Sequence, residues 1–240
     1  MRVTDEPAFV LHHHDYRETS LLLEAFTRHH GRVGLVAKGV RRARSPLRAV
    51  LIPFQPLVIG FSGRGELATL TAAEPLAPAP AFSGESLYCG LYLNELLLRL
   101  LHRHDPHERL FRVYGETLAR LAAAAPPEAA LRIFEKRLLE EIGYGLVLDR
   151  EVVGQAPLSA DLAYRYLPER GPIVAVSADD DGIPISGHSL LALAREEFTD
   201  AAVLAEAKRL LRALLARQLG TKPLMSRQLF RADRPGDAIE

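Results

Sequence analysis

Residues 20–38 read SLLLEAFTRHHGRVGLVAK, and this stretch contains two short apolar runs on either side of a polar turn. The runs cover residues 20–27 and 33–38, and the His-His-Gly-Arg segment between them favours a reversal of the chain. Apolar runs of this length, bounded by turn residues, are typical of β-strands. The stretch therefore predicts two consecutive strands in the N-terminal part of the fold.

Three more runs of the same kind surround this stretch. One precedes it at residues 8–12, and two follow it at residues 51–61 and 67–71. Pro53 and Pro56 require the first half of the fourth run to lie at an edge or bulge, because proline has no N–H to donate to a sheet. Five short strands in succession predict a small barrel such as the OB-fold, whose exposed strand face and loops bind oligonucleotides.

Beyond residue 83 the apolar residues recur every three or four positions, which indicates amphipathic helices. Ser83 is expected to cap the first helix, and Gly143 and Gly145 to follow the end of the third. Successive amphipathic helices imply a helical bundle. The expected helices cover residues 83–98, 110–121, 131–142, 189–197 and 200–219.

Two short runs at residues 164–167 and 173–176 predict a β-hairpin inserted into the helical part at about residues 160–178. The Pro/Ala-rich residues 74–80 predict a linker, because closely spaced prolines block both helix and sheet. We therefore expect an α+β multidomain protein. Residues 1–80 would form a five-stranded OB-fold barrel that binds nucleic acid, and residues 81–240 a mainly α-helical bundle domain with the hairpin insertion.

The overall net charge of zero conceals an uneven distribution of charge. Residues 25–65 contain eight basic side chains and no acidic one, so the rest of the chain carries a net charge of −8. A local positive field attracts a polyanion, although a solvated loop is the alternative explanation of a charge run. The candidate DNA-binding residues are Arg32, Lys38, Arg41, Arg42, Arg44 and Arg48.

Such cations suit a protein that binds nucleic acid without reading its sequence, because they neutralise phosphates while the base edges stay free. Aromatic side chains of the barrel are candidates for base stacking. Phenylalanine in a small barrel usually belongs to the core, so we expect at most one of them to contact DNA. These side chains are Phe9, Phe26, Phe54 and Phe61.

Motifs for catalysis are absent from the sequence. It lacks a nucleotide-binding phosphate loop, a nucleophile elbow and a His-Glu-x-x-His metal motif, so we expect no catalytic residues and no enzyme activity. Its single cysteine, Cys89, excludes a multi-cysteine zinc site, and its histidines do not form a ligand set, so we expect no metal and no cofactor. No signal peptide and no apolar run of membrane-spanning length is found, so we expect a cytoplasmic, nucleoid-associated protein.

Several collinear motifs over nearly the whole chain resemble the RecO family of bacterial DNA repair proteins. The resemblance implies a protein of DNA repair and homologous recombination that binds single- and double-stranded DNA and anneals single strands. It also implies cooperation with RecR and single-stranded DNA-binding protein in loading RecA. The motifs are residues 9–12, 18–21, 31–39, 63–66, 87–96, 134–145 and 222–231.

Many members of that family carry a four-cysteine zinc module after the Gly-Tyr-Gly segment, whereas residues 146–187 contain no cysteine here. The chain thus resembles a zinc-free branch. The resemblance further implies that the helical domain receives the acidic, apolar C-terminal tail of single-stranded DNA-binding protein. A cation beside an apolar groove fits such a tail, which points to Arg132, Phe134, Lys136 and Leu138.

Alternatives remain open at this point. The cations of the predicted 131–142 helix could instead pair with Glu135, Glu140 and Glu141 on the same helix. The cluster Lys208, Arg209 and Arg212 could extend the path of the DNA or simply be solvated. The whole protein could be an RNA-binding OB module, because the same face and charges suit RNA, or an adaptor whose arginines meet an acidic protein.

Overall fold

The computed structural model describes residues 2–63, 65–123, 126–177 and 181–232. The chain divides into two compact units. Unit 1 comprises Met1–Ala125 and Pro223–Glu240, and unit 2 comprises Pro126–Lys222. The predicted boundary near residue 80 falls inside unit 1, and the division into residues 1–80 and 81–240 stays a prediction. Arg64 of the predicted 63–66 turn and residue 178 of the predicted insertion lie outside the described residues.

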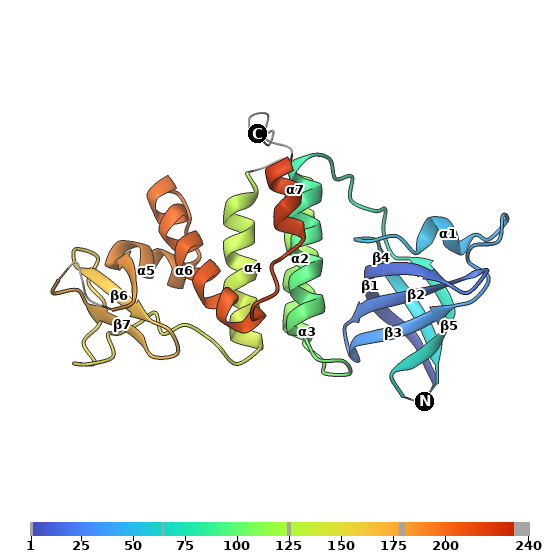
Figure 1. Cartoon of the computed structure of the whole chain (residues 1–240), viewed down its shortest axis with the longest axis horizontal. Coiled ribbons are helices and arrows are strands. Elements are labelled where there is room, and N and C mark those ends of the chain that lie inside the picture. The colour runs from blue at the N-terminus through green and yellow to red at the C-terminus, as the bar shows by residue number, and fades with distance from the viewer. Residues whose placement is uncertain (1, 64, 124–125, 178–180, 233–240) are drawn as a thin grey trace. The chain divides into compact units, whose positions relative to one another are not determined.

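Five strands of unit 1 form a closed barrel in the order β1-β2-β3-β5-β4 (Figure 1). The β3–β5 pair is parallel, whereas the other pairs are antiparallel, and β4 closes the barrel onto β1. This arrangement confirms the predicted OB-like barrel. The strands are β1 (Arg2–Tyr16), β2 (Ser20–Thr27), β3 (Gly31–Ala37), β4 (Pro56–Ser62) and β5 (Leu67–Pro75).

The barrel closes because its strands are bent and their inward-facing side chains fill the interior. The pairing shifts register at Leu11 of β1, between Val10 and His12, and at Thr71 of β5, opposite Gly60 and Phe61, and an extra residue of this kind bends its strand. Pro56 begins β4, so the first half of the predicted 51–61 run is not part of the strand. The interior is apolar and includes Val10, Leu23, Leu35, Leu57 and Ile59, each at most 2% exposed.

The long connection between β3 and β4 covers residues 38–55 and contains the short helix α1 (Leu47–Val50). Its backbone is ordered by turns, since the N–H of Arg42 donates to Gly39 O at 3.2 Å and the N–H of Ser45 donates to Arg42 O at 3.0 Å. Gly39 has a φ of 73°, a conformation that glycine adopts without steric cost. The connection therefore presents its side chains from a defined backbone.

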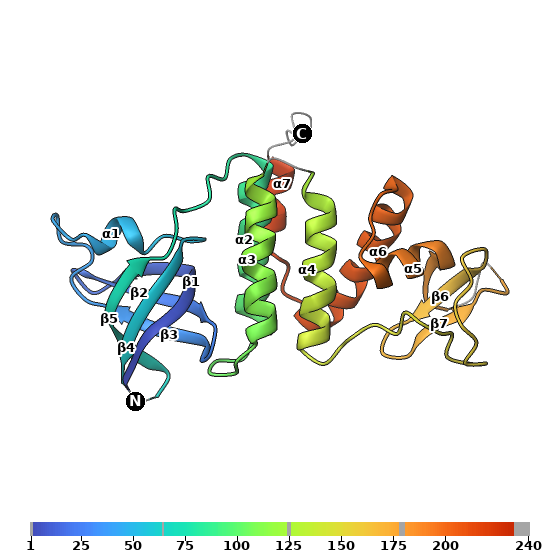
Figure 2. The same ribbon diagram turned by 180° about the vertical axis from the view of Figure 1, so that it is seen from behind.

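Three helices complete unit 1, namely α2 (Glu85–Leu100), α3 (Glu108–Ala122) and α7 (Ser226–Ala232). Helix α2 packs against both α3 and α7, and Figure 2 shows α3 running alongside α2. The N-cap of α2 is Gly84 and not the predicted Ser83, whose backbone N–H and C=O instead bond the Ser86 hydroxyl. Helix α7 was not predicted from the sequence. It attaches the last described residues of the chain to α2.

Buried polar and aromatic contacts join the barrel to these helices. Asn94 of α2 donates from Nδ2 to the carbonyl of Leu11 in β1 at 2.8 Å, and the Tyr114 hydroxyl donates to Asn94 Oδ1 at 2.5 Å. Phe9 and Phe26 of the barrel pack against Tyr114 with ring centroids 5.0 and 6.2 Å apart. Part of the barrel is therefore covered by α2 and α3 of the same unit.

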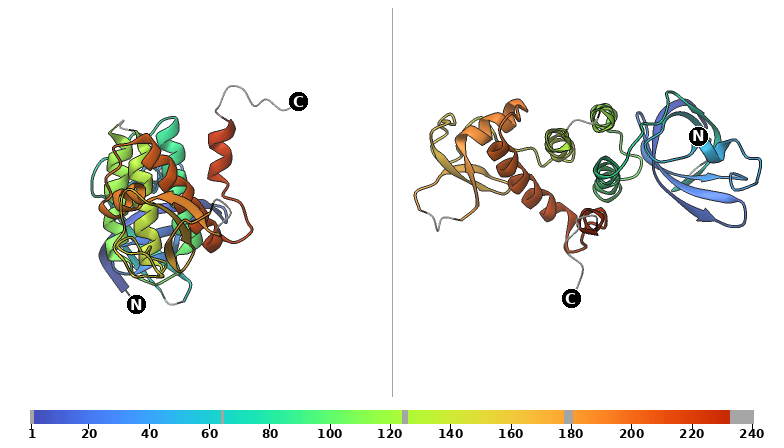
Figure 3. Two further views of the ribbon diagram at one scale, coloured as in Figure 1. Left: turned by 90° about the vertical axis from the view of Figure 1, so that its left-hand side faces the viewer. Right: turned by 90° about the horizontal axis from the view of Figure 1, so that it is seen from above.

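Unit 2 combines three helices with a small three-stranded sheet (Figures 1 and 3). The strand order in this sheet is β7-β6-β8. The β6–β7 hairpin lies within the predicted insertion, and the third strand, β8, was not predicted. Pro184 interrupts the strand pattern of β8, and it is tolerated because β8 is an edge strand that pairs only with β6. The elements are α4 (Pro127–Glu141), β6 (Ala163–Leu167), β7 (Gly171–Val174), β8 (Ile183–Ser186), α5 (Gly187–Arg195) and α6 (Ala201–Leu219).

Candidate nucleic-acid interface

The β3–β4 connection presents five of the six predicted DNA-binding cations to solvent. Lys38, Arg41, Arg42, Arg44 and Arg48 are all exposed. Within the described residues, the side chains of four of them have no hydrogen bond or ion pair, the exception being Arg41. The connection itself contains no carboxylate between residues 38 and 55. Cations in this state can meet phosphates without first giving up a protein partner.

Arg41 is held differently from its neighbours. Its guanidinium pairs with Asp15 at 2.9 Å and donates to the carbonyl of Arg17 at 3.1 Å. Its backbone N–H also donates to the carbonyl of Thr19 at 3.0 Å. All three partners belong to the end of the β1–β2 hairpin, so Arg41 fastens the β3–β4 connection to that hairpin.

Arg32 is the least accessible of the six predicted cations. It lies on β3 with its side chain 18% exposed, and its guanidinium is 3.4 Å from Glu24 of β2. Arg103, in the loop between α2 and α3, also bonds Glu24. Burial lowers the pKa of Arg32, Glu24 raises it and Arg103 lowers it again, and the net shift is downward. Arg32 is therefore engaged inside unit 1.

The four phenylalanines considered for base stacking are buried, with exposed fractions between 0 and 8%. Phe9 and Phe26 contact α3, Phe54 packs on Phe82, and Phe61 lies in the barrel core. The remaining aromatic residue of the first 80 is Tyr16, which is half-buried at the end of β1. Tyr16 was not among the stacking candidates taken from the sequence, although its position directly before the polar residues 17–19 places it next to a turn.

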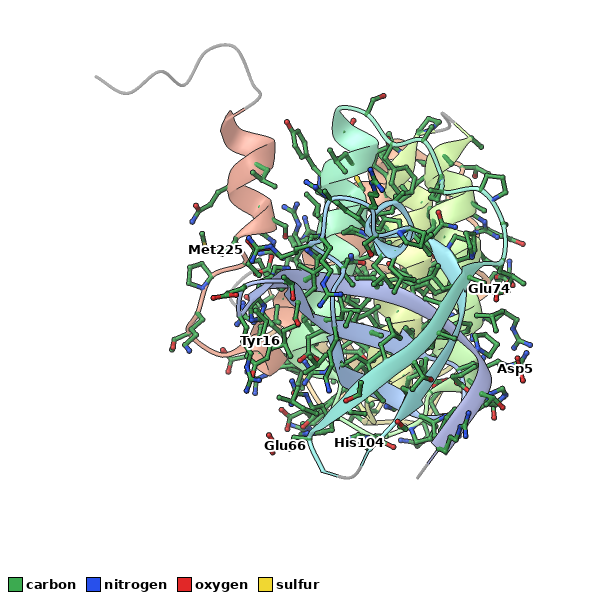
Figure 4. All side chains as sticks on the ribbon, turned by 90° about the vertical axis from the view of Figure 1, so that its right-hand side faces the viewer. Asp5, Tyr16, Glu66, Glu74, His104 and Met225 are labelled. Carbon is green, nitrogen blue, oxygen red and sulfur yellow. The ribbon has the colours of Figure 1, made fainter. Side chains whose placement is uncertain are left out.

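Tyr16 lies beside the cationic connection. Figure 4 looks onto the barrel and shows Tyr16 at the edge away from Asp5, so β1 runs across the barrel between these two residues. The guanidinium carbon of Arg17 lies 5.2 Å from the centre of the Tyr16 ring. The Tyr16 ring, the Arg17 guanidinium over it and the cationic connection thus lie near one another at the end of the β1–β2 hairpin.

The predicted tail-binding residues of α4 are buried inside unit 2. Phe134 and Leu138 have no exposed surface, and Arg132 and Lys136 are 3 and 5% exposed. Arg132 bonds Glu135 at 2.6 Å, which is one of the alternative partners considered from the sequence. Lys136 donates to Glu196 at 3.0 Å and to the carbonyl of Ala194 at 3.1 Å.

A second group of cations in unit 2 adjoins Arg132. The pKa of Lys208 on α6 is lowered by burial first, and then by the nearby charges of Arg212 and Arg132, while Glu128 and Glu135 oppose the shift. The Nε of Arg132 is buried and has no hydrogen-bond partner among the described residues. Cations from α4 and α6 therefore lie close enough to act on one another, with Glu128 and Glu135 nearby.

The histidines do not form a metal site in the described part of the chain, where no group of three or more potential ligands is found. His29 and His30 instead lie 3.0 and 3.3 Å from Oε2 of the buried Glu6. Zinc independence of the whole chain stays a prediction. No helix among the described residues is both long enough and apolar enough to cross a membrane.

A closed five-stranded barrel with an exposed cationic connection is typical of proteins that bind nucleic acid through an OB-fold. Comparison with known families agrees with this class. Residues 1–79 match the family described as "Recombination protein O N terminal", and residues 81–228 match "Recombination protein O C terminal". The chain belongs to the RecO family of DNA repair and recombination proteins.

Relatives over nearly the full length support the same assignment. The chain is 52% identical to the DNA repair protein RecO of Nitrosococcus oceani, over 96% of this chain and 94% of that one. It is 50% identical to DNA repair protein RecO of Thiobacillus denitrificans, over 96% and 92% of the two chains. Membership makes this protein a DNA-binding, non-enzymatic mediator of recombination.

Proposed function

We propose that this protein anneals complementary single strands of DNA and uses the β3–β4 connection to hold their phosphates. The observation that carries the proposal is the row of exposed, unpaired cations at Lys38, Arg42, Arg44 and Arg48. Each cation that meets a phosphate releases condensed counterions, which drives binding without regard to sequence. Contacts to phosphates leave the base edges free to find their complement.

The proposed role extends to the partners that the family resemblance implies. The protein would act with RecR on DNA coated by single-stranded DNA-binding protein and help RecA to load there. Binding of double-stranded DNA, the product of annealing, uses the same phosphates and the same cations. The cluster of Lys208 and Arg212 on α6 is a second place where the backbone of DNA, or another anion, can be attracted.

We also propose that the tail of single-stranded DNA-binding protein is received around Arg132, Phe134, Lys136 and Leu138. Arg132 and Arg212 lie close enough to Lys208 for their charges to act on it, and this grouping of cations supports the placement because the tail is acidic. Because Phe134 and Leu138 are buried, their proposed contribution is to pack α4 in place. The tail itself would contact the exposed surface of unit 2 next to these residues. Arg132→Ala should then weaken binding of a fluorescent tail peptide while leaving binding of naked single-stranded DNA intact. Equal weakening of both, or of neither, overturns the assignment.

The annealing proposal is tested by the combined variant Arg42→Ala, Arg44→Ala and Arg48→Ala. For single strands, the slope of log K against log salt falls by roughly 0.7 for each phosphate contact, so the triple variant should lose about two units of slope. Annealing of complementary oligonucleotides should slow in parallel. The matched control removes three exposed arginines of α3, Arg109, Arg112 and Arg120, and keeps the total charge change equal.

Two results would contradict the proposal. An unchanged salt slope in the triple variant would mean that the connection is only a solvated loop. An equal loss in the α3 control would mean that net charge, and not this surface, governs binding. Competition with folded RNA in the same assay shows whether the surface prefers RNA, which would redirect the proposal to an RNA-binding function.

A further inference from the structure

We infer that the end of the β1–β2 hairpin, carrying Tyr16 and Arg17, is a second nucleic-acid-binding element that stacks on an unpaired base, and that Arg41 positions it. This inference rests on the proposed function, since it presumes that the β3–β4 connection binds the phosphates of a single strand. It assigns Arg41 a different role from the cations beside it. It also makes the surface selective for unpaired bases.

The first step of the argument is the link between the two segments. Arg41 reaches the hairpin through three contacts, to the carboxylate of Asp15 and to the carbonyls of Arg17 and Thr19. Two of these contacts come from one planar guanidinium, and the third comes from the backbone. A guanidinium offers several donors in a fixed plane, so it can hold two acceptors at once where an ammonium cannot keep the same geometry.

The second step is electrostatic. Asp15 is exposed at the end of the hairpin and would repel a phosphate backbone that follows the connection. Its pairing with Arg41 at 2.9 Å neutralises this carboxylate. Glu18 in the turn remains exposed, so the phosphates are expected to follow Arg42, Arg44 and Arg48, and the hairpin is left to meet a base.

The third step is the stacking surface itself. The other aromatic residues of the first 80 are buried, whereas Tyr16 is half-buried and carries the exposed Arg17 at 5.2 Å from its ring centre. Nucleobases stack on aromatic rings and on guanidinium planes, and this contact tolerates any sequence. Bases inside a duplex are already stacked on their neighbours, so such a platform favours a single strand.

The test compares an ordinary oligonucleotide with an abasic one of equal length, which keeps the phosphates and removes the bases. The unmodified protein should bind the ordinary strand about tenfold more tightly than the abasic strand, because one stacked base contributes a gain in affinity of about this size. Tyr16→Ala should lose most of this preference while keeping its salt slope, and Tyr16→Phe should retain the preference. An unchanged preference in Tyr16→Ala overturns the inference.

The charge-conserving variant Arg41→Lys tests the positioning role. It should keep the salt slope, because the charge remains, and reduce the preference for the ordinary strand, because an ammonium cannot keep both guanidinium contacts to the hairpin. Asp15→Asn should act in the same direction. If Arg41→Lys preserves the preference, Arg41 is an ordinary phosphate contact.

Failure of the inference can be told apart from failure of the proposed function. The Arg42, Arg44 and Arg48 triple variant reports on the phosphate path through the salt slope. The Tyr16 and Arg41 variants report on the base through the ratio of the two affinities. If the triple variant loses salt slope but the unmodified protein does not prefer the ordinary strand, only the proposed function is supported. If the triple variant keeps its salt slope, both the proposed function and the inference are overturned.

Discussion

Arginine and lysine lie in two contrasting settings in this molecule. In the β3–β4 connection, Arg42, Arg44 and Arg48 are exposed and have no side-chain partner among the described residues. In α4, Arg132 and Lys136 are nearly fully buried and bonded to Glu135 and Glu196. The first group costs the fold little and is free to bind. The second group is used to hold unit 2 together, because a buried charge must be paired.

The largest expected effect comes from breaking the buried pair on α4. Glu135→Ala removes the carboxylate bonded to Arg132 and leaves that cation buried without its partner. Loss of one member of a buried pair costs about 3–5 kcal/mol of unfolding free energy. Chemical denaturation followed by circular dichroism measures it.

Exposed charges should behave differently in the same assay. Arg44→Ala, and the exposed Glu197→Ala in unit 2, should each change stability by no more than about 0.5 kcal/mol. Equal destabilisation by Glu135→Ala and Arg44→Ala would remove the distinction between the two groups of cations.

Lys136→Met should have a smaller effect than Glu135→Ala. The apolar replacement keeps the packing volume, and Glu196 retains a partner because Arg137 pairs with it at 2.7 Å. The carbonyl of Ala194 loses its donor, which costs about 1–2 kcal/mol. A loss as large as that of Glu135→Ala would contradict this ranking of the two positions.

Glu95 of α2 is a carboxylate that helps to hold α7, because it accepts hydrogen bonds from Met225 and Ser226. Burial alone would raise the pKa of Glu95. Hydrogen bonds from the Ser226 hydroxyl and from the N–H groups of Ser226 and Met225 outweigh burial, and the charge of Arg99 also lowers the pKa. The pKa of Glu95 therefore lies below its usual value of 4.5. A carboxyl with a lowered pKa stabilises the fold above pH 4.5, and this contribution is lost as the pH falls through the lower, folded-state value.

Glu95→Gln should therefore weaken the attachment of α7 to α2 at pH 7. In this variant the protection of the α7 amides from hydrogen exchange should also depend less on pH below 4.5. Solvent screening limits the effect to about 1 kcal/mol or less. Hydrogen exchange of the α7 amides measures it, and Glu116→Gln on the exposed face of α3 is the matched control. Identical pH profiles for the two variants would contradict the assignment.

The smallest expected effect concerns metal. His29 and His30 contact Glu6, and no described group offers the four ligands of a structural zinc site. A chelator should therefore leave the melting temperature unmoved, and elemental analysis should find no stoichiometric zinc. About one zinc per chain would defeat this prediction.

The strands and long helices could be predicted because their signals are local. The 20–27 run coincides with β2, and Asp200 caps α6 by accepting from the N–H of Ala202, close to the predicted start of that helix. Turn residues and apolar periodicity act over a few neighbouring positions. Helix α7 and strand β8 are short, so they gave too weak a pattern.

The state of each candidate cation depended on contacts that are distant in sequence. Arg32 is engaged by Glu24 across the β2–β3 pair, and Arg103 joins them from a loop 79 residues away from Glu24. Lys136 meets Glu196, which is 60 residues away. A single sequence shows which residues carry charge, and only the folded chain shows which charges are already neutralised.

The placement of α7 has a consequence for synthesis of the chain. Unit 1 is completed by residues from Pro223 onward, which follow the whole of unit 2 in the sequence. At about 5–20 residues per second, the ribosome spends roughly 5–20 seconds on unit 2 before it reaches them. The barrel, α2 and α3 can therefore assemble early, while the α2 surface around Glu95 stays uncovered until the residues that follow unit 2 have been made. A chain that stalls before Pro223 would keep its cationic connection but leave Glu95 without Ser226, so docking of α7 reports that the whole of unit 2 has already been synthesised.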